Sequence, residues 1–401
     1  MKIGVLGGTF NPIHNGHIEM ARKALEMASL DEVWVMPAGM PPHKDQNGVC
    51  SSMHRMNMCR LACKPFLHIL ASDFEINSET NNYTYQTLEK LSACYPKDKF
   101  YFIMGQDSVE SFRTWKEPQS ILKHASLLVF LRGNHYDEEK LRCRETINGL
   151  KKDFEGEIIP LDFEPLAISS SKIRLLISKN ADSSEVKPLL CDEVYQYIKE
   201  HRLYETIEEY DTKAFQKELK KVLKPSRYEH SLGVADTSAS LAAAYGYPKH
   251  LAYVAGLLHD CAKYMSNEEL LDYATKHKVD ITKGDRKALH LLHAPVGAYI
   301  ACNKYGIKDE DLLHAISVHT TGCPNMTLLD KIIFVADYIE PHRDKAPRLE
   351  ELRKLSYKDI DRAIVMILED TINYIKSGDS YIDKRTFETY EYYKKETNHE
   401  Y

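Results

Sequence analysis

Six side chains in the second half of the sequence are of the types that bind transition metals, and each lies in an apolar stretch typical of a buried helix. They are His230, His259, Asp260, His293, His319 and Asp337. Burying four imidazoles and two carboxylates costs free energy unless metal ions pair them. Neighbouring side chains on a helix point about 100° apart, so His259 and Asp260 converge on one ion only near the helix axis, unless the carboxylate bridges two ions. We therefore expect two divalent or trivalent transition metals, and Fe, Mn and Zn all suit these ligands.

Two cations near these ligands could bind a phosphate substrate, whose phosphorus would be attacked by a metal-activated water. Lys263 lies one helical turn after His259, and Lys263 and Arg343 could both neutralise phosphate charge. The alternative is that both are solvated surface cations. For any single ligand candidate a hydrogen-bonded core residue is the simpler interpretation, and only the whole set of six favours a metal centre.

A glycine-rich segment near the N-terminus has the composition of a phosphate-binding loop. Its candidate ligand-binding residues are Gly7, Gly8, Thr9, Phe10, His14 and His17. The glycines admit a close approach of the backbone, and the helix that starts near Gly16 aims free N–H groups at an anion. The two histidines could donate hydrogen bonds to phosphoryl oxygens. The segment matches neither a Walker loop nor a dinucleotide fingerprint. The alternative is a turn whose histidines cap a helix.

A second helix N-terminus follows much later in the same half, where Ser169, Ser170 and Ser171 precede Lys172 and Arg174. We expect the hydroxyls to cap the first turn and to reach a polyphosphate, while the two cations add positive charge. Alone this is an ordinary helix start. Together with the first loop it predicts a nucleoside triphosphate held between two helix N-termini, with both loop histidines near the α-phosphate.

The elements around these residues predict two domains. In the first half helices alternate with strands at Lys2–Leu6, Glu32–Met36, Lys99–Met104, Ser126–Phe130 and Glu157–Pro160. This alternation predicts a Rossmann-like, doubly wound parallel sheet. From Asp211 to Ile375 a period of about 3.6 residues predicts an all-helical domain. A chain of 401 residues is also long for one core, and we place the domains at residues 1–207 and 208–401.

Composition narrows the class of protein. With 43% hydrophobic and 28% charged residues the chain is globular, and its net charge of −6 argues against a nucleic-acid binder. It contains no apolar run of about 18 residues and begins with a strand signal, so we expect neither a membrane span nor a secretory signal. Its 9 cysteines lack paired spacing, which fits the reduced thiols of a cytoplasmic protein. A homo-oligomer is compatible with all of this.

The first half resembles the bacterial nicotinate-nucleotide adenylyltransferases, a family of nucleotidyltransferases. The resemblance rests on Gly7–His17, on Pro37–Lys44 and on Ile168–Arg174, with Gly105-Gln106-Asp107 and Trp115 similar to the family's pattern. It covers roughly residues 1–205. It implies that nicotinate mononucleotide attacks the α-phosphate of ATP with the help of Mg²⁺ and that no protein nucleophile is needed.

The same resemblance implies roles for individual residues. His14, His17 and Arg174 contact the triphosphate, Asp107 lies against the ribose, and Thr84 and Trp115 lie around the pyridine ring. We also expect Lys44, Gly105 and Lys172 among the residues that bind ATP or the substrate. Ordinary core packing is the alternative for Trp115. Two positions depart from the family pattern: Gln106 stands where a small residue is expected, and Arg132-Gly133-Asn134 replaces Arg-Pro-Gly.

The second half resembles the HD superfamily of metal phosphohydrolases, and within it the symmetrical diadenosine tetraphosphatases. The resemblance rests on His293–Ala298, on His319–Gly322 with Met326, and on Ala336–Pro341 with Arg343. It implies a di-iron-type centre on the same six ligands and hydrolysis of diadenosine tetraphosphate to two ADP. Thr320 and Arg343 join the expected substrate-binding residues.

These observations predict a bifunctional enzyme whose partners are ATP, nicotinate mononucleotide and diadenosine tetraphosphate. Two alternatives stay open for the second half, because the HD signature accompanies many phosphate substrates. The domain could hydrolyse another nucleotide phosphate, or it could sense a nucleotide or metal without turnover.

Overall fold

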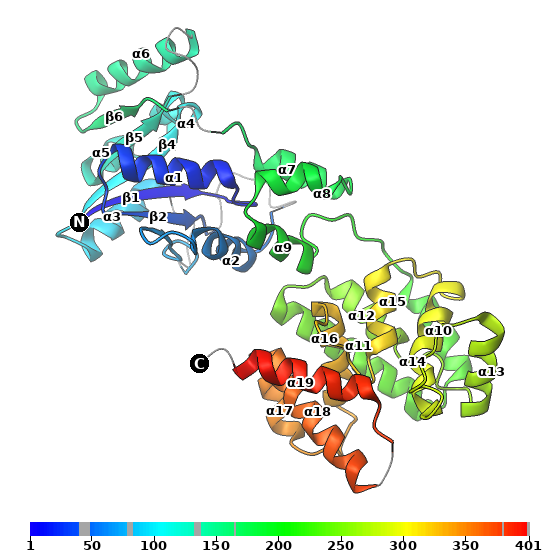
Figure 1. The fold of residues 1–401 in the computed structure, drawn as a ribbon. Helices are drawn as coiled ribbons and strands as arrows, with labels where there is room; N and C mark the ends of the chain where they lie inside the picture. The colour runs from blue at the N-terminus through cyan, green and yellow to red at the C-terminus, as the bar shows by residue number, and fades with distance from the viewer. Residues whose placement is uncertain (40–48, 78–82, 132–137, 164–165, 379–380, 399–401) are drawn as a thin grey trace. The chain divides into compact units, whose positions relative to one another are not determined.

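The computed structural model describes residues 1–39, 49–77, 83–131, 138–163, 166–378 and 381–398. The chain forms two compact units, which are Met1–Lys199 with Leu203–Thr206 and Glu200–Arg202 with Ile207–Tyr401 (Figure 1).

A parallel sheet forms the centre of the first unit. Its strands are β1 (Lys2–Gly8), β2 (Glu32–Pro37), β3 (Ile69–Ala71), β4 (Lys99–Gly105), β5 (Ala125–Phe130) and β6 (Ile158–Leu161). They lie in the order β3-β2-β1-β4-β5-β6, which is the Rossmann-like topology that we predicted. The three-residue strand β3 was not predicted, because so short a segment has no periodicity of its own.

Helices cover both faces of the sheet, and the side chains of the strands alternate between two cores. The helices of this unit are α1 (Asn15–Met27), α2 (Ser52–Cys63), α3 (Thr84–Cys94), α4 (Gln106–Glu110), α5 (Pro118–His124), α6 (Glu138–Asp153), α7 (Ser170–Ser178), α8 (Ser183–Val186) and α9 (Asp192–Glu200). In β5, Leu128 and Phe130 pack with α1, α2, α7 and α9, whereas Leu127 and Val129 pack with α3, α5 and α6.

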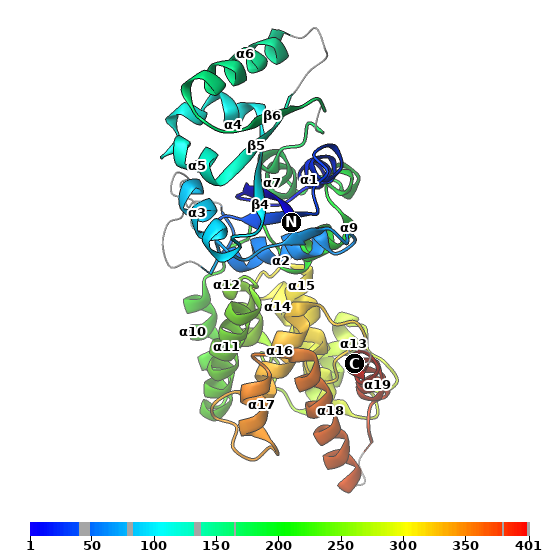
Figure 2. The same cartoon turned by 90° about the vertical axis from the view of Figure 1, so that its left-hand side faces the viewer.

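The second unit is helical throughout its described residues (Figure 2), as its periodicity predicts. Its helices are α10 (Thr212–Val222), α11 (Pro225–Tyr245), α12 (Lys249–Leu258), α13 (Asn267–His277), α14 (His293–Asn303), α15 (Glu310–Val318), α16 (Leu328–Ile339), α17 (Leu349–Leu355), α18 (Ile360–Ser377) and α19 (Lys384–Asn398).

Close packing of α11 against α12 depends on Gly256. A Cβ atom there would lie 2.9 Å from the Cα atom of Ala235 and 3.0 Å from the carbonyl oxygen of Val234, so a larger residue would push the two helices apart. The approach matters because each of these helices carries a predicted metal ligand. Among the described residues, no helix combines the length and the apolar character that a membrane crossing needs.

Candidate active sites

Helix ends carry most of the predicted metal ligands of the second unit. His259 is the C-cap residue of α12, and Asp260 follows it directly. His319 is the C-cap residue of α15, with the partly exposed Thr320 after it, and His293 is the first residue of α14. All four ligand side chains are buried. The fold therefore brings together residues that are up to 60 positions apart in the chain.

Asp260 is shared by two groups of ligand atoms. The groups are His230, His259 and Asp260 on one side, and Asp260, His293 and His319 on the other. Its Oδ2 lies 3.7 Å from His259 Nε2, while its Oδ1 lies 3.3 Å from His293 Nε2 and 3.6 Å from His319 Nε2. Each carboxylate oxygen thus faces its own set of imidazoles, which is the arrangement of a bridging ligand.

The protonation of three histidines follows from their backbone partners. The Nδ1 atoms of His259 and His319 donate to the carbonyl oxygens of Gly256 and Ile316 at 2.6 and 2.7 Å, and His293 Nδ1 donates to the carbonyl oxygen of residue 290 at 2.5 Å. A carbonyl only accepts, so in the neutral rings every Nε2 carries a lone pair.

Those lone pairs point at one another rather than at hydrogen-bond donors. His293 Nε2 and His319 Nε2 lie 3.2 Å apart, and the buried His259 Nε2 has no hydrogen-bond partner in the part of the chain that the structure describes. Burial lowers the pKa of His259 to about 4 and that of His293 well below its usual value, so neither ring supplies a proton at neutral pH. Cations are what such converging lone pairs can bind, so the residues present fit a metal centre.

His230 differs from the other three because a carboxylate orients it. Its Nδ1 lies 3.1 Å from Glu340 Oε1, and its Nε2 lies 3.0 Å from Oδ1 of the sixth ligand, Asp337. Glu340 is buried and also accepts the amide proton of His342 at 2.7 Å. A Cβ atom at Gly233 would lie 2.5 Å from Glu340 Oε2, so that glycine leaves room for the carboxylate.

Three cationic side chains lie around the six ligands. Arg227 Nη1 lies 3.4 Å from Asp260 Oδ2, and Arg343 Nη2 lies 3.2 Å from Asp337 Oδ1. Burial lowers the pKa of Lys263, which the charge of Asp260 partly offsets. Arg227 was missed by sequence reasoning, although its spacing of three residues from His230 places both on one face of α11.

In the first unit, His14 and His17 stack at the start of α1. Their ring centroids lie 3.6 Å apart, and the backbone N–H of His14 donates to His17 Nδ1 at 3.2 Å. Burial lowers the pKa of His14 to about 4 and that of His17 well below its usual value. Both rings are therefore neutral at pH 7, and His17 keeps its proton on Nε2 as a donor. A Cβ atom at Gly16 would lie 3.1 Å from the carbonyl oxygen of Leu166 and 3.2 Å from His14 Nδ1, so a larger residue there would crowd the His14 ring.

The N-terminus of α7 is fastened to the loop after β1. Ser170 Oγ donates to the carbonyl oxygen of Pro12 at 2.8 Å, and Arg174 Nη1 donates to that of Asn11 at 2.7 Å. This brings the two predicted phosphate-binding segments together. The expected capping is wrong for Ser169, whose side chain makes no cap hydrogen bond, because the helix end is held by contacts with the loop instead. Ser171 and Lys172 are exposed.

A buried arginine that sequence reasoning missed supports the same loop. Arg55 of α2 donates to the carbonyl oxygens of Thr9, Ala38, Gly39 and Cys50 at 3.0, 2.6, 2.7 and 3.3 Å. It ties the loop after β1 to the loop after β2. No local sequence signal marks it, since its partners are backbone carbonyls and three of the four lie 16 or more residues away in the chain.

Trp115, which we expect beside the pyridine ring, packs against a residue that contacts the end of β1. The ring of Trp115 packs 6.0 Å from that of Phe102, which in turn lies 3.5 Å from the Cβ position of Gly7. Lys116 lies over the ring of Tyr83, at 4.2 Å, and Tyr83 immediately precedes Thr84 at the start of α3. This contact links the two segments that carry Thr84 and Trp115.

Four further predicted residues lie at or just after the ends of β1 and β4. A Cβ atom at Gly105 would meet no atom of the described residues within 4 Å, so these residues leave space open where β4 ends. The exposed Asp107 lies in the first turn of α4. Gly8 is packed against Phe10, whose ring lies 3.0 Å from its Cβ position. Lys44 and Arg132-Gly133-Asn134 lie outside the described residues.

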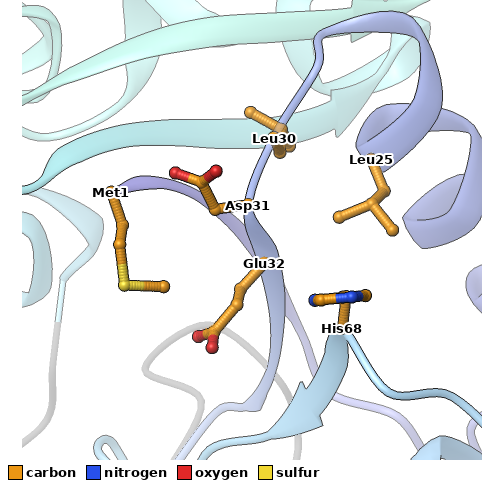
Figure 3. A pocket seen from close by; sticks show the side chains of 6 residues that line it. All are labelled: Met1, Leu25, Leu30, Asp31, Glu32 and His68. Atoms are coloured by element: carbon orange, nitrogen blue, oxygen red, sulfur yellow. The ribbon is translucent and has the colours of Figure 1, made fainter.

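A pocket of about 600 Å³ in the first unit lies away from this loop. Its lining residues are Met1, Leu25, Leu30, Asp31, Glu32 and His68 (Figure 3). Met1 and Glu32 stand at the N-terminal ends of β1 and β2. Ligands of open α/β sheets bind at the carboxyl ends of the strands, so the pocket has no part in the nucleotide site.

Comparison with known families agrees with this division of the chain. The Cytidylyltransferase-like model matches residues 5–176, and the HD domain model matches residues 227–342. A protein of Mycoplasma genitalium named a probable nicotinate-nucleotide adenylyltransferase/Ap4A hydrolase is 28% identical over 380 residues, covering 94% of this chain and 99% of its own length.

Two shorter relatives each match one half. A probable nicotinate-nucleotide adenylyltransferase of Carboxydothermus hydrogenoformans is 36% identical over 203 residues, which are 51% of this chain and 98% of that protein. A symmetrical bis(5'-nucleosyl)-tetraphosphatase of Bacillus subtilis is 38% identical over 172 residues, which are 43% of this chain and 91% of that protein. The chain therefore belongs to the nicotinate-nucleotide adenylyltransferase family in its first half and to the HD-domain symmetrical bis(5'-nucleosyl)-tetraphosphatase family in its second.

Proposed function

We propose that this chain is a bifunctional enzyme that transfers AMP from ATP to nicotinate mononucleotide and cleaves diadenosine tetraphosphate into two ADP. The observation that carries the second activity is Asp260, whose two oxygens face separate sets of imidazole lone pairs. The first activity rests on the two helix N-termini fastened together by Ser170 and Arg174.

In the transfer reaction a phosphate oxygen of nicotinate mononucleotide attacks the α-phosphorus of ATP, and the bond to the β-phosphate breaks to release pyrophosphate. Negative charge grows on the phosphoryl oxygens as this happens. His17 donates its Nε2 proton in a hydrogen bond to that charge, and Arg174 adds a positive charge beside the loop. The phosphate site is shaped by residues of both helix N-termini, which are Gly7, Gly8, Thr9, Phe10, His14, Ser169, Ser171 and Lys172. Mg²⁺ accompanies the ATP.

Binding of the two nucleotides uses the rest of the first site. The pyridine ring of the mononucleotide lies against Trp115 and Thr84, and the adenosine ribose lies by Gly105 and Asp107. This keeps the attacking phosphate in line with the α-phosphorus, and positioning of this kind lowers the barrier without a covalent intermediate.

In the hydrolysis reaction water attacks a phosphorus of the tetraphosphate bridge so that two phosphates leave with each adenosine. Iron is the first choice for the two ions, with manganese or zinc as alternatives, and such ions lower the pKa of a nearby water and polarise a phosphoryl oxygen. The ions would be held by the six ligands described above, which are His230, His259, Asp260, His293, His319 and Asp337. Arg227, Lys263, Arg343 and Thr320 bind the remaining phosphate groups.

Product analysis of a paired variant tests whether the two sites are separate. Replacing His259 and Asp260 together by Ala should abolish release of ADP from diadenosine tetraphosphate and leave formation of nicotinate adenine dinucleotide unchanged. His277→Ala, in α13 and outside the six ligands, is the matched control and should keep both activities. Loss of both activities in the double variant would contradict two independent sites.

The second candidate function for the helical unit is a sensor that binds a nucleotide or metal without turnover. The same six ligands would hold its metal. A metal-loaded chain that binds diadenosine tetraphosphate and releases no ADP would support the sensor. Release of a product other than ADP from a panel of nucleotide phosphates would indicate a different hydrolase.

A further inference from the structure

A third group of potential metal ligands lies apart from the six described above. His314 belongs to α15, Cys323 follows Gly322 in the connection to α16, and Asp330 lies in the first turn of α16. One ligand atom of each lies within 4.8 Å of the other two. His314 Nδ1 lies 3.0 Å from both carboxylate oxygens of Asp330.

The position of Asp330 is fixed by the fold. Its side chain is fully buried, its Oδ2 accepts the amide proton of Thr327 at 2.8 Å, and its own amide donates to Thr327 Oγ1 at 3.2 Å. These bonds form the N-terminal cap of α16 and leave Oδ1 toward His314. The carboxylate is thus held in place whether or not a metal binds.

The three donors form a set that suits zinc. Thiolate sulfur, imidazole nitrogen and carboxylate oxygen are its usual ligands, at bond lengths of about 2.0–2.3 Å that place tetrahedral ligand atoms roughly 3.3–3.8 Å apart. The separation of 3.0 Å between His314 and Asp330 must therefore open by a few tenths of an ångström. His314 can move by that much because its side chain is 49% exposed. A water can fill the fourth position.

We propose that His314, Cys323 and Asp330 bind one zinc ion that links the end of α15 to the start of α16. The segment between them, His319–Gly322, carries a ligand of the main centre, so the ion fixes the backbone on which His319 stands. The competing explanation for the short distance between His314 and Asp330 is a simple ion pair, in which Cys323 has no part.

Sulfur ligation gives this site a signal of its own. Asp260 and its partners offer only nitrogen and oxygen, and the nearby Cys261 is buried and donates to the carbonyl oxygen of Gly297 at 3.3 Å. Cobalt(II) replaces zinc in such sites, and a thiolate ligand adds a charge-transfer absorption in the near ultraviolet. Cobalt in the six-ligand centre lacks that absorption.

The test is a cobalt(II) titration of the metal-free full-length chain, followed by optical absorption. The parent chain should show the charge-transfer band, Cys323→Ser should lose it, and Cys302→Ser, which removes an exposed thiol of α14, should keep it. Absence of the band in the parent chain overturns the proposal, as does its survival in Cys323→Ser or its equal loss in Cys302→Ser.

A second variant guards against misfolding. His314→Gln keeps a polar side chain at an exposed position, and it should bind cobalt at the thiolate site at least tenfold more weakly, with an unchanged helical circular dichroism spectrum. Zinc should also raise the Tm of the parent chain by more than that of Cys323→Ser, which keeps only the six-ligand centre. Unchanged cobalt affinity in His314→Gln would overturn the proposal even if Cys323→Ser failed to fold.

Discussion

The two candidate sites both use neutral histidines, but the ring proton is on Nε2 in the first site and on Nδ1 in the second. In the first unit His17 Nδ1 accepts a backbone N–H, so Nε2 holds the proton and can donate to an anion. In the second unit His259 and His319 donate from Nδ1 to backbone carbonyls, so Nε2 presents a lone pair to a cation. One backbone contact therefore decides whether a neutral imidazole binds phosphate or metal.

Helix polarity explains which contact each histidine makes. His17 lies in the first turn of α1, where N–H groups have no partner within the helix. His259 and His319 are C-cap residues, and the carbonyls three residues earlier are free to accept. His293 opens α14, yet it follows a 3₁₀ turn whose last carbonyls serve in the same way. Helix polarity thus accounts for the proton on Nε2 of His17 and for the lone pairs on Nε2 of His259 and His319, while His293 depends on the 3₁₀ turn before its helix.

Metal removal should separate the two sites most strongly. Chelation followed by dialysis into excess Mg²⁺ should reduce hydrolysis of diadenosine tetraphosphate to background, because the lone pairs of His293 and His319 then have no cation between them. Adenylyl transfer should persist. The Tm of the helical unit should fall as well, since metal binding contributes to folding free energy.

Restoring the metal is the control for that experiment. Addition of Fe²⁺ or Mn²⁺ should return the hydrolysis rate and the Tm together. Hydrolysis of diadenosine tetraphosphate by the metal-free chain would contradict the claim that the histidines of the second unit bind a catalytic metal.

His17→Ala should have the next largest effect, and on the other activity. Loss of one hydrogen-bond donor to transition-state charge lowers kcat by roughly 10²–10³, or about 2.7–4 kcal/mol. The rate of nicotinate adenine dinucleotide formation measures it, and hydrolysis should be unchanged. His68→Ala is the matched control, because His68 is exposed and lies beside the pocket of Figure 3. A tenfold or smaller loss in His17→Ala would mean that its Nε2 does not contact the reacting phosphate.

Sequence reasoning could predict the parallel sheet, the helical second unit and the segments that meet at each site. It succeeded for those elements because hydrophobic periodicity reports burial directly. It could not find β3, which is three residues long, or Arg55, three of whose four carbonyl partners lie 16 or more residues away in the chain. It also expected Ser169 to cap α7, whereas the loop after β1 holds that helix end. Contacts between distant backbone segments leave no local pattern.

Glu340 tests whether a histidine ligand needs a backbone carbonyl to orient it. Among the described residues, His230 is the one histidine ligand whose Nδ1 faces a carboxylate and not a backbone carbonyl. Glu340→Ala should weaken metal binding at the centre about 10–100-fold, since the imidazole loses the partner that orients it. Glu340→Gln keeps an acceptor oxygen and should lose less. Metal titration of the purified chain measures both, and Glu350→Gln, on the exposed face of α17, is the matched control. Equal metal affinity in all three variants would show that His230 needs no carboxylate to hold its lone pair toward the metal.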